Sequence, residues 1–510
     1  MTVGRTWGVV LTGLRGDLVE VEADLSSQTP AFVIIGLADK AIAEAHQRVH
    51  NACANSELPL PRRKLTVNLS PANLPKQGSA LDVAIAVAAL ATEHDLDRAS
   101  LAQTAHIGEL GLDGRLRPVA GVLPAVAAAA RVGIRRAVVP FANREEAALV
   151  EGVEVLGAVC LRDVARWHGL DVDEVSLEPV PHPGVGSAPS SAAVPDLSDV
   201  IGQADAVDAL TVAAAGGHHV LMSGPPGAGK TMLARRLPGI LPGLDDDDAV
   251  QAASLRSLAG ERVDTLSRTP PFEAPHHSAS ATALIGGGSR TVRPGAIARA
   301  SGGVLFLDEA GEFAPHALDA LRQPLESGLI EIHRAGFRAV FPARFQLVLA
   351  TNPCPCGNYG VPAAECTCPS LAIRRYLGKL SGPLRDRIDI ELGLRRVSSA
   401  QSATSTAVTS SAQVREQVGS ARERARHRLR STPWRTNAQV SGPWLRNGPL
   451  AADPDIRRPL DAALHRGALT LRGYDRVLRV AWSVADLAGH DRLRAADIGR
   501  ALYLKKGVEA

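Results

Sequence analysis

Aromatic residues and lysine are both scarce in this chain of 510 residues. Phenylalanine, tryptophan and tyrosine together make up 3% of the composition, which argues against a large base-stacking platform for single-stranded nucleic acid. Lysine occurs seven times against 49 arginines, a bias that we attribute to coding composition rather than to function. No run of 18 or more apolar residues occurs, so we expect no membrane span. Residues 1–7 have no signal-peptide pattern, and we expect a cytoplasmic location.

Charge is unevenly distributed along the chain. The length and the 45% hydrophobic content indicate about three ordinary globular domains. Net charge is only +3, but residues 411–510 hold 19 Lys and Arg against 10 Asp and Glu, a net of +9. The first 410 residues therefore carry a net charge of −6. A basic C-terminal region suits an anionic partner such as nucleic acid, and it equally suits a solvated helical face.

One glycine-rich segment has the pattern G-x-x-x-x-G-K-[ST], between the apolar residues 220–222 and a helix-like stretch at 232–237. Glycines let backbone N–H groups surround phosphates, and the following helix directs its positive end at them. The lysine reaches the β- and γ-phosphates, and the hydroxyl can ligate Mg²⁺. We therefore predict binding of a nucleoside triphosphate and Mg²⁺ by Gly224, Pro225, Pro226, Gly227, Ala228, Gly229, Lys230 and Thr231.

Two acidic residues, Asp308 and Glu309, follow four apolar residues at 304–307. Such a run is typical of a fully buried parallel strand, which places both carboxylates at its carboxyl end. We expect Asp308 to hold the Mg²⁺ shell together with Thr231, as in P-loop NTPases. Glu309 is predicted to polarise the attacking water.

The six cysteines divide into two isolated residues and one cluster. Cys53 and Cys160 are expected to be buried as small apolar residues. In a cytosolic chain a cluster favours metal over disulfides, and four thiolates could make a tetrahedral Zn²⁺ site. Free thiols in a loop are the alternative. The cluster comprises Cys354, Cys356, Cys366 and Cys368.

Three further segments carry charge or histidine. The acidic run 245–248 is interpreted as a solvated loop. His276 and His277 are adjacent, so we expect them to point to different sides and to have a structural or inter-subunit role rather than to bind a metal. Residues 328–341 are predicted to form a β-hairpin, and Arg334 and Arg338 near its tip could follow a phosphate backbone. A solvated basic turn is the other interpretation.

Two stretches of the N-terminal region, 74–83 and 108–118, resemble the Lon protease domain and its non-proteolytic relative in RadA recombination proteins. Lon-type proteases use a Ser–Lys dyad. The serine position corresponds to Ala80, Ser79 is one residue out of register, and the lysine would fall near Leu123. A nucleophile without a base gives little activity. We therefore expect a Lon-like fold that is not proteolytic.

The middle of the chain resembles AAA+ ATPases. Residues 195–203 look like the segment that lies against adenine, and residues 274–297 resemble the helix-2 insertion of magnesium-chelatase-type proteins, where it forms a pore loop. The resemblance implies that Asn352 is sensor 1 and that Arg387, with Arg385 as a neighbouring candidate, is the arginine finger. It implies sensor 2 at Arg472, with Arg476 and Arg479 as alternatives. Arg290 in the insertion joins Arg334 and Arg338 as a candidate DNA contact.

Taken together, these segments resemble the magnesium-chelatase-like AAA+ family of bacterial YifB and ComM proteins. The resemblance implies a homo-oligomeric, hexameric ring that uses ATP and Mg²⁺ to translocate on DNA. It implies branch migration during recombination of incoming DNA, with recombination proteins as possible partners. A protein-remodelling ATPase without DNA activity, either chelatase-like or a chaperone, is the alternative.

The expected fold class is α/β. We predict a Lon-like domain over 1–170, a linker over 171–195, an AAA+ domain over 196–395, a second linker over 396–412 and a helical lid over 413–510. Lid helices are expected at about 411–430, 456–466, 473–488 and 495–504.

Overall fold

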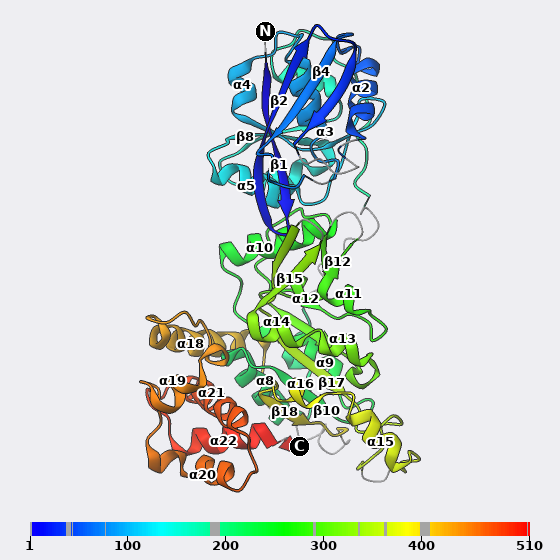
Figure 1. Cartoon of the computed structure of the whole chain (residues 1–510). Coiled ribbons are helices and arrows are strands. Elements are labelled where there is room, and N and C mark those ends of the chain that lie inside the picture. Colours follow the sequence, from blue (N-terminus) through cyan, green and yellow to red (C-terminus); the bar gives the residue numbers. More distant parts are fainter. Residues whose placement is uncertain are drawn as a thin grey trace.

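The chain forms three regions, and the N-terminal one is set apart from the other two along the long direction of the molecule (Figure 1). The structure is a computed structural model that describes residues 3–36, 42, 44–76, 78–183, 194–288, 292–334, 337–361, 365–397, 409–506 and 508–509. An N-terminal α/β region lies at one end, and a middle α/β region and the C-terminal helices lie side by side toward the other end. Among the described helices, none combines the length and the apolar character needed to cross a bilayer.

The N-terminal region is built on a seven-stranded mixed sheet. Its central strands, β1 and β2, pair antiparallel from Gly4–Ala23 to Thr12–Arg15 and form one long hairpin. The hairpin turns at Gly13, whose φ of +66° favours glycine. In spatial order the strands are β3 (Ala31–Ile35), β4 (Lys64–Ser70), β2 (Arg15–Ser26), β1 (Gly4–Thr12), β5 (Thr104–His106), β8 (Arg136–Pro140) and β9 (Glu154–Ala158).

Helices pack against this sheet, and the hydrophobic core lies between them and the strands. Every residue of α3 (Asp82–Leu90) is buried, as its nearly continuous apolar sequence requires. The other helices of the region are α2 (Ala45–Asn55), α4 (Arg98–Ala102), α5 (Val122–Arg131), α6 (Arg144–Ala147) and α7 (Leu161–Trp167).

The middle region is a parallel sheet whose carboxyl edge carries the nucleotide site. Three of its strands, β10, β14 and β17, are fully or almost fully buried, as expected from their apolar runs. In spatial order the strands are β11 (Phe272–Glu273), β14 (Val304–Leu307), β17 (Gln346–Thr351), β10 (Val220–Ser223), β18 (Ile390–Gly393) and β19 (Val508–Glu509). The last strand comes from the C-terminal end of the chain and pairs parallel with β18. The predicted α/β fold class is confirmed.

The C-terminal helices share one hydrophobic core with the middle region. Val418 and Val477 from these helices pack in the same cluster as Leu210 of α8 (Ala204–Gly216). The predicted helical C-terminal region is confirmed, with one additional short helix, α19. The helices are α18 (Ser411–Leu429), α19 (Gly442–Asn447), α20 (Pro454–His465), α21 (Leu471–Ala488) and α22 (Ala495–Lys506).

The N-terminal and middle regions contact each other through α5 and α10 (Asp246–Ala259). Leu123 of α5 packs against Ala253 and Val263. The backbone N–H of Gly121 donates to the Ser257 carbonyl at 3.1 Å. The position that corresponds to the Lon lysine is therefore an apolar contact between two regions.

The acidic run at 245–248 is exposed to solvent, as predicted, but it begins α10 instead of forming a loop. Asp245 caps α10 by accepting a hydrogen bond from the backbone N–H of Asp248 at 2.8 Å. The other acidic residues occupy the first turn, where the positive end of the helix dipole stabilises them.

Candidate nucleotide-hydrolysis site

The glycine-rich loop lies between the end of β10 and the start of α9 (Lys230–Ile240). Gly227 and Gly229 have φ angles of +79° and +87°, a region that favours glycine. The ammonium group of Lys230 donates to the carbonyl oxygens of Gly224, at 2.5 Å, and Pro225, at 3.0 Å. Lys230 is 9% exposed, and burial lowers its pKa. The loop therefore surrounds the ammonium group of Lys230, which the motif assigns to the phosphates.

The predicted magnesium ligands lie next to each other. The Thr231 hydroxyl donates to Asp308 Oδ2 at 2.7 Å. Thr231 is on the first turn of α9, and Asp308 directly follows β14. A hydroxyl and a carboxylate are oxygen ligands of the kind that Mg²⁺ prefers beside substrate phosphates. These two side chains fit a magnesium ion and would hold it at the start of α9.

Glu309 has an unusual backbone and a partner that the sequence analysis did not identify. Its φ is +50°, which is uncommon for a residue other than glycine and is often found at functional sites. Its carboxylate Oε2 lies 3.1 Å from His277 Nδ1. The side chains of Glu309 and His277 are 52% and 37% exposed, so this pair is open to solvent.

The prediction that His276 and His277 point to different sides is wrong. Their ring centroids lie 4.1 Å apart with an interplanar angle of 35°. Alternation applies to strands, but residues 274–276 after β11 are irregular and the chain enters a turn at His277. Because β11 pairs with β14, the segment that follows it ends beside Glu309.

The predicted sensor residue Asn352 lies at the same edge of the sheet. It accepts a hydrogen bond from Lys230 Nζ at its Oδ1, at 3.0 Å. This contact follows from strand order, since β17 pairs with β10 and the N–H of Gly224 donates to the Thr351 carbonyl at 3.2 Å. Lys230, Thr231, Asp308 and Asn352 therefore form one cluster.

The segment before α8 also contacts the loop. Gln203 Nε2 donates to the carbonyl oxygens of Ala228, at 3.3 Å, and Arg395, at 3.0 Å. Ile201 is 48% exposed, which leaves an apolar surface available to a base. Arg396 Nε donates to the Pro226 carbonyl at 3.1 Å, and this neighbour of the loop was missed from sequence.

The arginines implied by the resemblance have partners within this chain. Arg387 Nη1 donates to the Pro383 carbonyl at 2.6 Å, and its guanidinium pairs with Glu326, which leaves the side chain 12% exposed. Arg385 pairs with Glu391 at 3.2 Å and is 51% exposed.

The three sensor-2 candidates on α21 differ in their surroundings. Arg476 pairs with the buried Asp389 at 2.6 Å. Arg479 Nε donates to the Val440 carbonyl at 2.8 Å. Arg472 is exposed. Arg476 and Arg479 are therefore used in holding α21 in place, and Arg472 is the one of the three open to solvent.

The four clustered cysteines come together in the loop after β17. Their sulfur atoms all lie within 4.8 Å of one another. Hydrogen bonds from the Asn358 backbone and the Cys354 thiol lower the pKa of Cys356 to about 6. The cluster begins two residues after Asn352, so it adjoins the nucleotide site in the chain.

The candidate DNA contacts are described only in part. The predicted hairpin is present as β15 (Leu329–Arg334) and β16 (Phe337–Pro342), and Arg338 pairs with Glu331 across it. Arg290 and the side chain of Arg334 lie outside the described residues. The turn of the N-terminal hairpin lies against β16, since Gly13 bridges to Val340.

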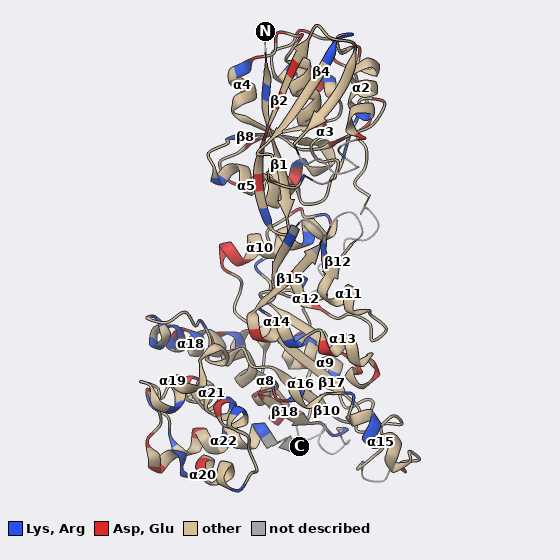
Figure 2. Ribbon diagram, in the orientation of Figure 1, with Lys and Arg blue, Asp and Glu red and all other residues tan. Residues whose placement is uncertain are grey.

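Part of the basic character of the C-terminal region is used in contacts within the protein. Lys and Arg are frequent along α18 (Figure 2), and two of its arginines, Arg422 and Arg428, have partners inside the protein. Arg422 donates to the Ala214 carbonyl at 2.7 and 3.0 Å, and burial lowers its pKa to about 10. Arg428 pairs with Asp486 at 2.6 Å. Arg415 and Arg424 donate to backbone carbonyls. The charge excess alone therefore does not indicate a DNA surface.

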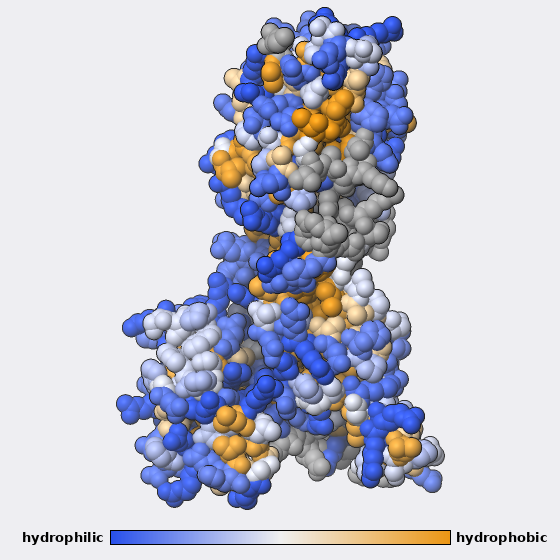
Figure 3. All heavy atoms as spheres, in the orientation of Figure 1, coloured by the Kyte–Doolittle hydropathy of each residue, from blue (hydrophilic) through white to orange (hydrophobic). Residues whose placement is uncertain are grey.

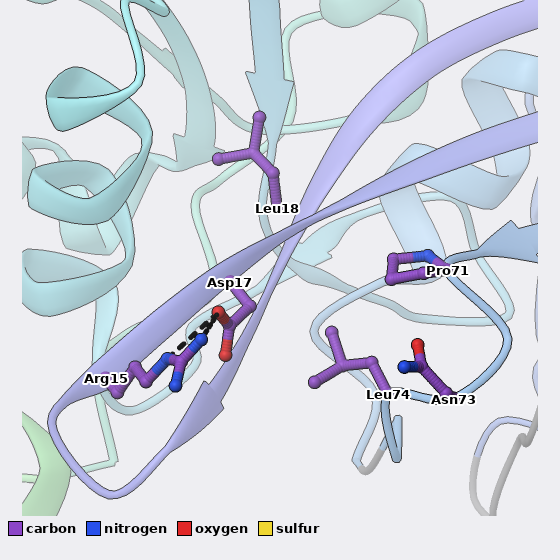
Figure 4. Close-up of a pocket in the computed structure, with 6 residues that line it drawn as sticks. All are labelled: Arg15, Asp17, Leu18, Pro71, Asn73 and Leu74. Atoms are coloured by element: carbon purple, nitrogen blue, oxygen red, sulfur yellow. Dashed lines mark hydrogen bonds and ion pairs between the residues drawn. The ribbon is translucent and has the colours of Figure 1, made fainter.

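The Lon-like region has no Ser–Lys pair at the expected positions. Ser79 donates to Glu109, and Leu123 is buried at the contact with α10. A cavity of about 310 Å³ in this region is lined by the hairpin and the loop after β4, and Arg15 and Asp17 form an ion pair at 2.9 Å within it (Figure 4). None of its lining residues belongs to the nucleotide site.

Comparison with known proteins decides the family. Three family models match: "Subunit ChlI of Mg-chelatase" over residues 21–143, "Magnesium chelatase, subunit ChlI" over 196–402 and its C-terminal model over 408–505. The chain is 42% identical to Competence protein ComM of Haemophilus influenzae over 506 residues, which cover 98% of this chain and 97% of the relative. The chain belongs to the magnesium-chelatase-like YifB/ComM family.

Members of this family resemble the chain over nearly its whole length. It is 39% identical to the uncharacterized protein YifB of Escherichia coli, over 94% of this chain and 92% of YifB. Lon protease 2 of Bacillus subtilis is 29% identical over 206 residues, 35% of this chain and 36% of the relative. The protein is a magnesium-chelatase-like AAA+ ATPase with a Lon-like region, and its family implies the use of ATP and Mg²⁺.

Proposed function

We propose that this YifB/ComM family member is an ATP-driven ring motor that acts on DNA, as a helicase or branch-migration factor in recombination of incoming DNA. The observation that carries the motor part is the cluster at the sheet edge, where Thr231 contacts Asp308 at 2.7 Å and Lys230 contacts Asn352 at 3.0 Å. Such a cluster binds triphosphate and metal in one fixed geometry. The similarity to a protein named for competence supports the DNA part.

In this proposal Glu309 activates water and Arg387 completes the site of a neighbouring copy. In the single chain, the guanidinium of Arg387 forms an ion pair with Glu326 of the same chain. Assembly into a ring, which we propose to be hexameric, would exchange that partner for the neighbour's phosphate. Hydrolysis then depends on assembly, since an arginine finger contributes about 10³–10⁵-fold in rate in GTPases. The cofactors of the motor are ATP, Mg²⁺ and a Zn²⁺ ion in the cysteine cluster.

A protein-remodelling ATPase is the second candidate. The family models, which carry the name of a chelatase subunit, favour it. The inward-facing arginines of α18 also remove one argument for DNA.

The two candidates are separated by ATP hydrolysis with and without DNA. We expect single-stranded or forked DNA to raise the steady-state hydrolysis rate of the full chain, and we expect added salt to weaken this effect. A Lys230→Ala variant, which cannot contact the phosphates, serves as the background. Hydrolysis by the wild type that DNA leaves unchanged at low salt would favour the remodelling ATPase.

A further inference from the structure

The cysteine cluster, Cys354, Cys356, Cys366 and Cys368, has the dimensions of a tetrahedral metal site. Cys366 Sγ lies 3.8 Å from Cys354 Sγ and 3.7 Å from Cys356 Sγ, and the last two are 3.3 Å apart. Four sulfurs at about 2.3 Å from one zinc ion lie about 3.8 Å from one another. A disulfide would need a separation of about 2.05 Å. The spacing therefore fits four thiolates around Zn²⁺.

The surroundings of the cluster also suit a structural ion. Cys354 is fully buried, and the backbone N–H of Tyr359 donates to its sulfur at 3.3 Å. Such hydrogen bonds orient metal-binding thiolates. No other group of three or more His, Cys, Asp or Glu side chains among the described residues converges in this way.

The cluster lies directly against the phosphate-binding loop. Gly357 closes the turn that begins at Cys354, with its N–H donating to the Cys354 carbonyl at 3.0 Å. A side-chain carbon at Gly357 would overlap the ring of Pro226. Asn352, which accepts from Lys230, is two residues before Cys354. The turn at 354–357 therefore supplies two thiols and lies against Pro226, and Asn352 precedes it by two residues.

The rest of the cysteine segment projects from the body. Helix α15 (Ser370–Leu377) follows Cys368 and lies at the far edge of the middle region (Figure 1). Apolar surface is visible there in Figure 3, and Tyr359 and Leu371 are 53% and 67% exposed. With so little core of its own, this segment would depend on a metal for its order, as small metal-binding modules do.

We propose that the cysteine cluster binds a structural Zn²⁺ ion and that this ion holds the turn at 354–357 against Pro226, so that the metal supports ATP binding. The coupling rests on the proposed nucleotide site, whereas the metal site itself does not. The ion takes no part in hydrolysis, because four thiolates complete its coordination.

Metal content tests the site. The full chain, purified without added metal, is expected to contain about one zinc per chain by mass spectrometry, as a closed four-thiolate site requires. A double variant, Cys366→Ser with Cys368→Ser, should lose the zinc. Cys160→Ala, a buried cysteine outside the cluster, should retain it. A folded wild type that binds no zinc even when Zn²⁺ is supplied would overturn the proposal.

A pair of glycine variants tests the coupling. Gly357 and Gly360 have similar φ angles of +80° and +74°, but a carbon added at Gly360 would meet no atom within 4 Å. Gly357→Ala should weaken binding of a fluorescent ATP analogue by about tenfold, as expected when overpacking displaces a packed loop. Gly360→Ala, which carries the same backbone strain, should change binding by less than about twofold. Both variants should retain zinc.

Two results would contradict the coupling. One is equal ATP affinity in the two glycine variants. The other is unchanged affinity after a chelator has removed zinc from the wild type in the presence of Mg²⁺. Wild type that binds ATP no better than Lys230→Ala would instead refute the proposed nucleotide site and leave the zinc measurement valid.

Discussion

Replacing Arg476 by alanine should destabilise the packing of the C-terminal helices against the middle region. Arg476 Nη1 pairs with Asp389 at 2.6 Å, and its Nε donates to the Asp386 carbonyl at 2.5 Å. The two side chains are 15% and 1% exposed, so the pair is shielded from solvent. Although burial alone would raise the pKa of Asp389, Arg476 and two histidines hold it well below its ordinary value.

Removing the arginine leaves a buried carboxylate without its main partner, which costs about 3–5 kcal/mol in comparable pairs. For a region of about 200 residues this corresponds to a fall of about 6 °C or more in the melting temperature. Differential scanning calorimetry of Arg476→Ala measures it, with Arg472→Ala, an exposed residue of the same helix, as the control. If Arg476→Ala kept the melting temperature of the wild type but lost most of its ATP hydrolysis, Arg476 would be sensor 2. The structural role assigned to it here would then be refuted.

Three other outcomes follow from the geometry of the site and of the Lon-like region. Arg387→Ala should retain ATP binding but lose about 10³-fold or more in turnover; normal turnover would show that another arginine is the finger. Glu309→Gln should reduce hydrolysis by about 10²–10⁴-fold, whereas His277→Ala, which removes a solvent-exposed partner, should reduce it by less than about fivefold. Similar losses in both variants, compared by kcat, would show that His277 does more than position Glu309. Burial lowers the pKa of His168 from 6.5 to about 4, so its contribution to stability is complete above about pH 6.5 and decreases as the pH falls toward 4; a melting temperature that stays constant across this range would contradict it.

Much of the site could be predicted because its chemistry is local in sequence. The loop that ends in Thr231 and the strand that ends before Asp308 are each continuous segments with fixed spacing. Parallel strands end at the same edge of a sheet, so a correct strand assignment also brings Asn352 to Lys230. Fold class followed from the same alternation of apolar strands and helices.

The features of the site and fold that could not be predicted from sequence depend on contacts between segments that are distant in the chain. His277 reaches Glu309 because β11 lies beside β14, and its own segment carries no periodic pattern. Similarly, whether Arg422 meets DNA or the Ala214 carbonyl depends on which face of α18 packs against α8. The composition gives the charge of such a residue but not the direction in which its side chain points. The same limit applied to the acidic run at 245–248, where the cap at Asp245 is only evident once α10 is placed.

Unwinding or branch migration of a labelled forked substrate tests most directly the proposal that this ATPase moves DNA. With ATP and Mg²⁺, we predict displacement of the labelled strand by the wild type and none by Glu309→Gln, which should still bind ATP and the fork. Binding to the fork should weaken as salt is raised, because phosphate contacts release counterions. A wild type that hydrolyses ATP but neither binds the fork at low salt nor displaces its strand would contradict the account.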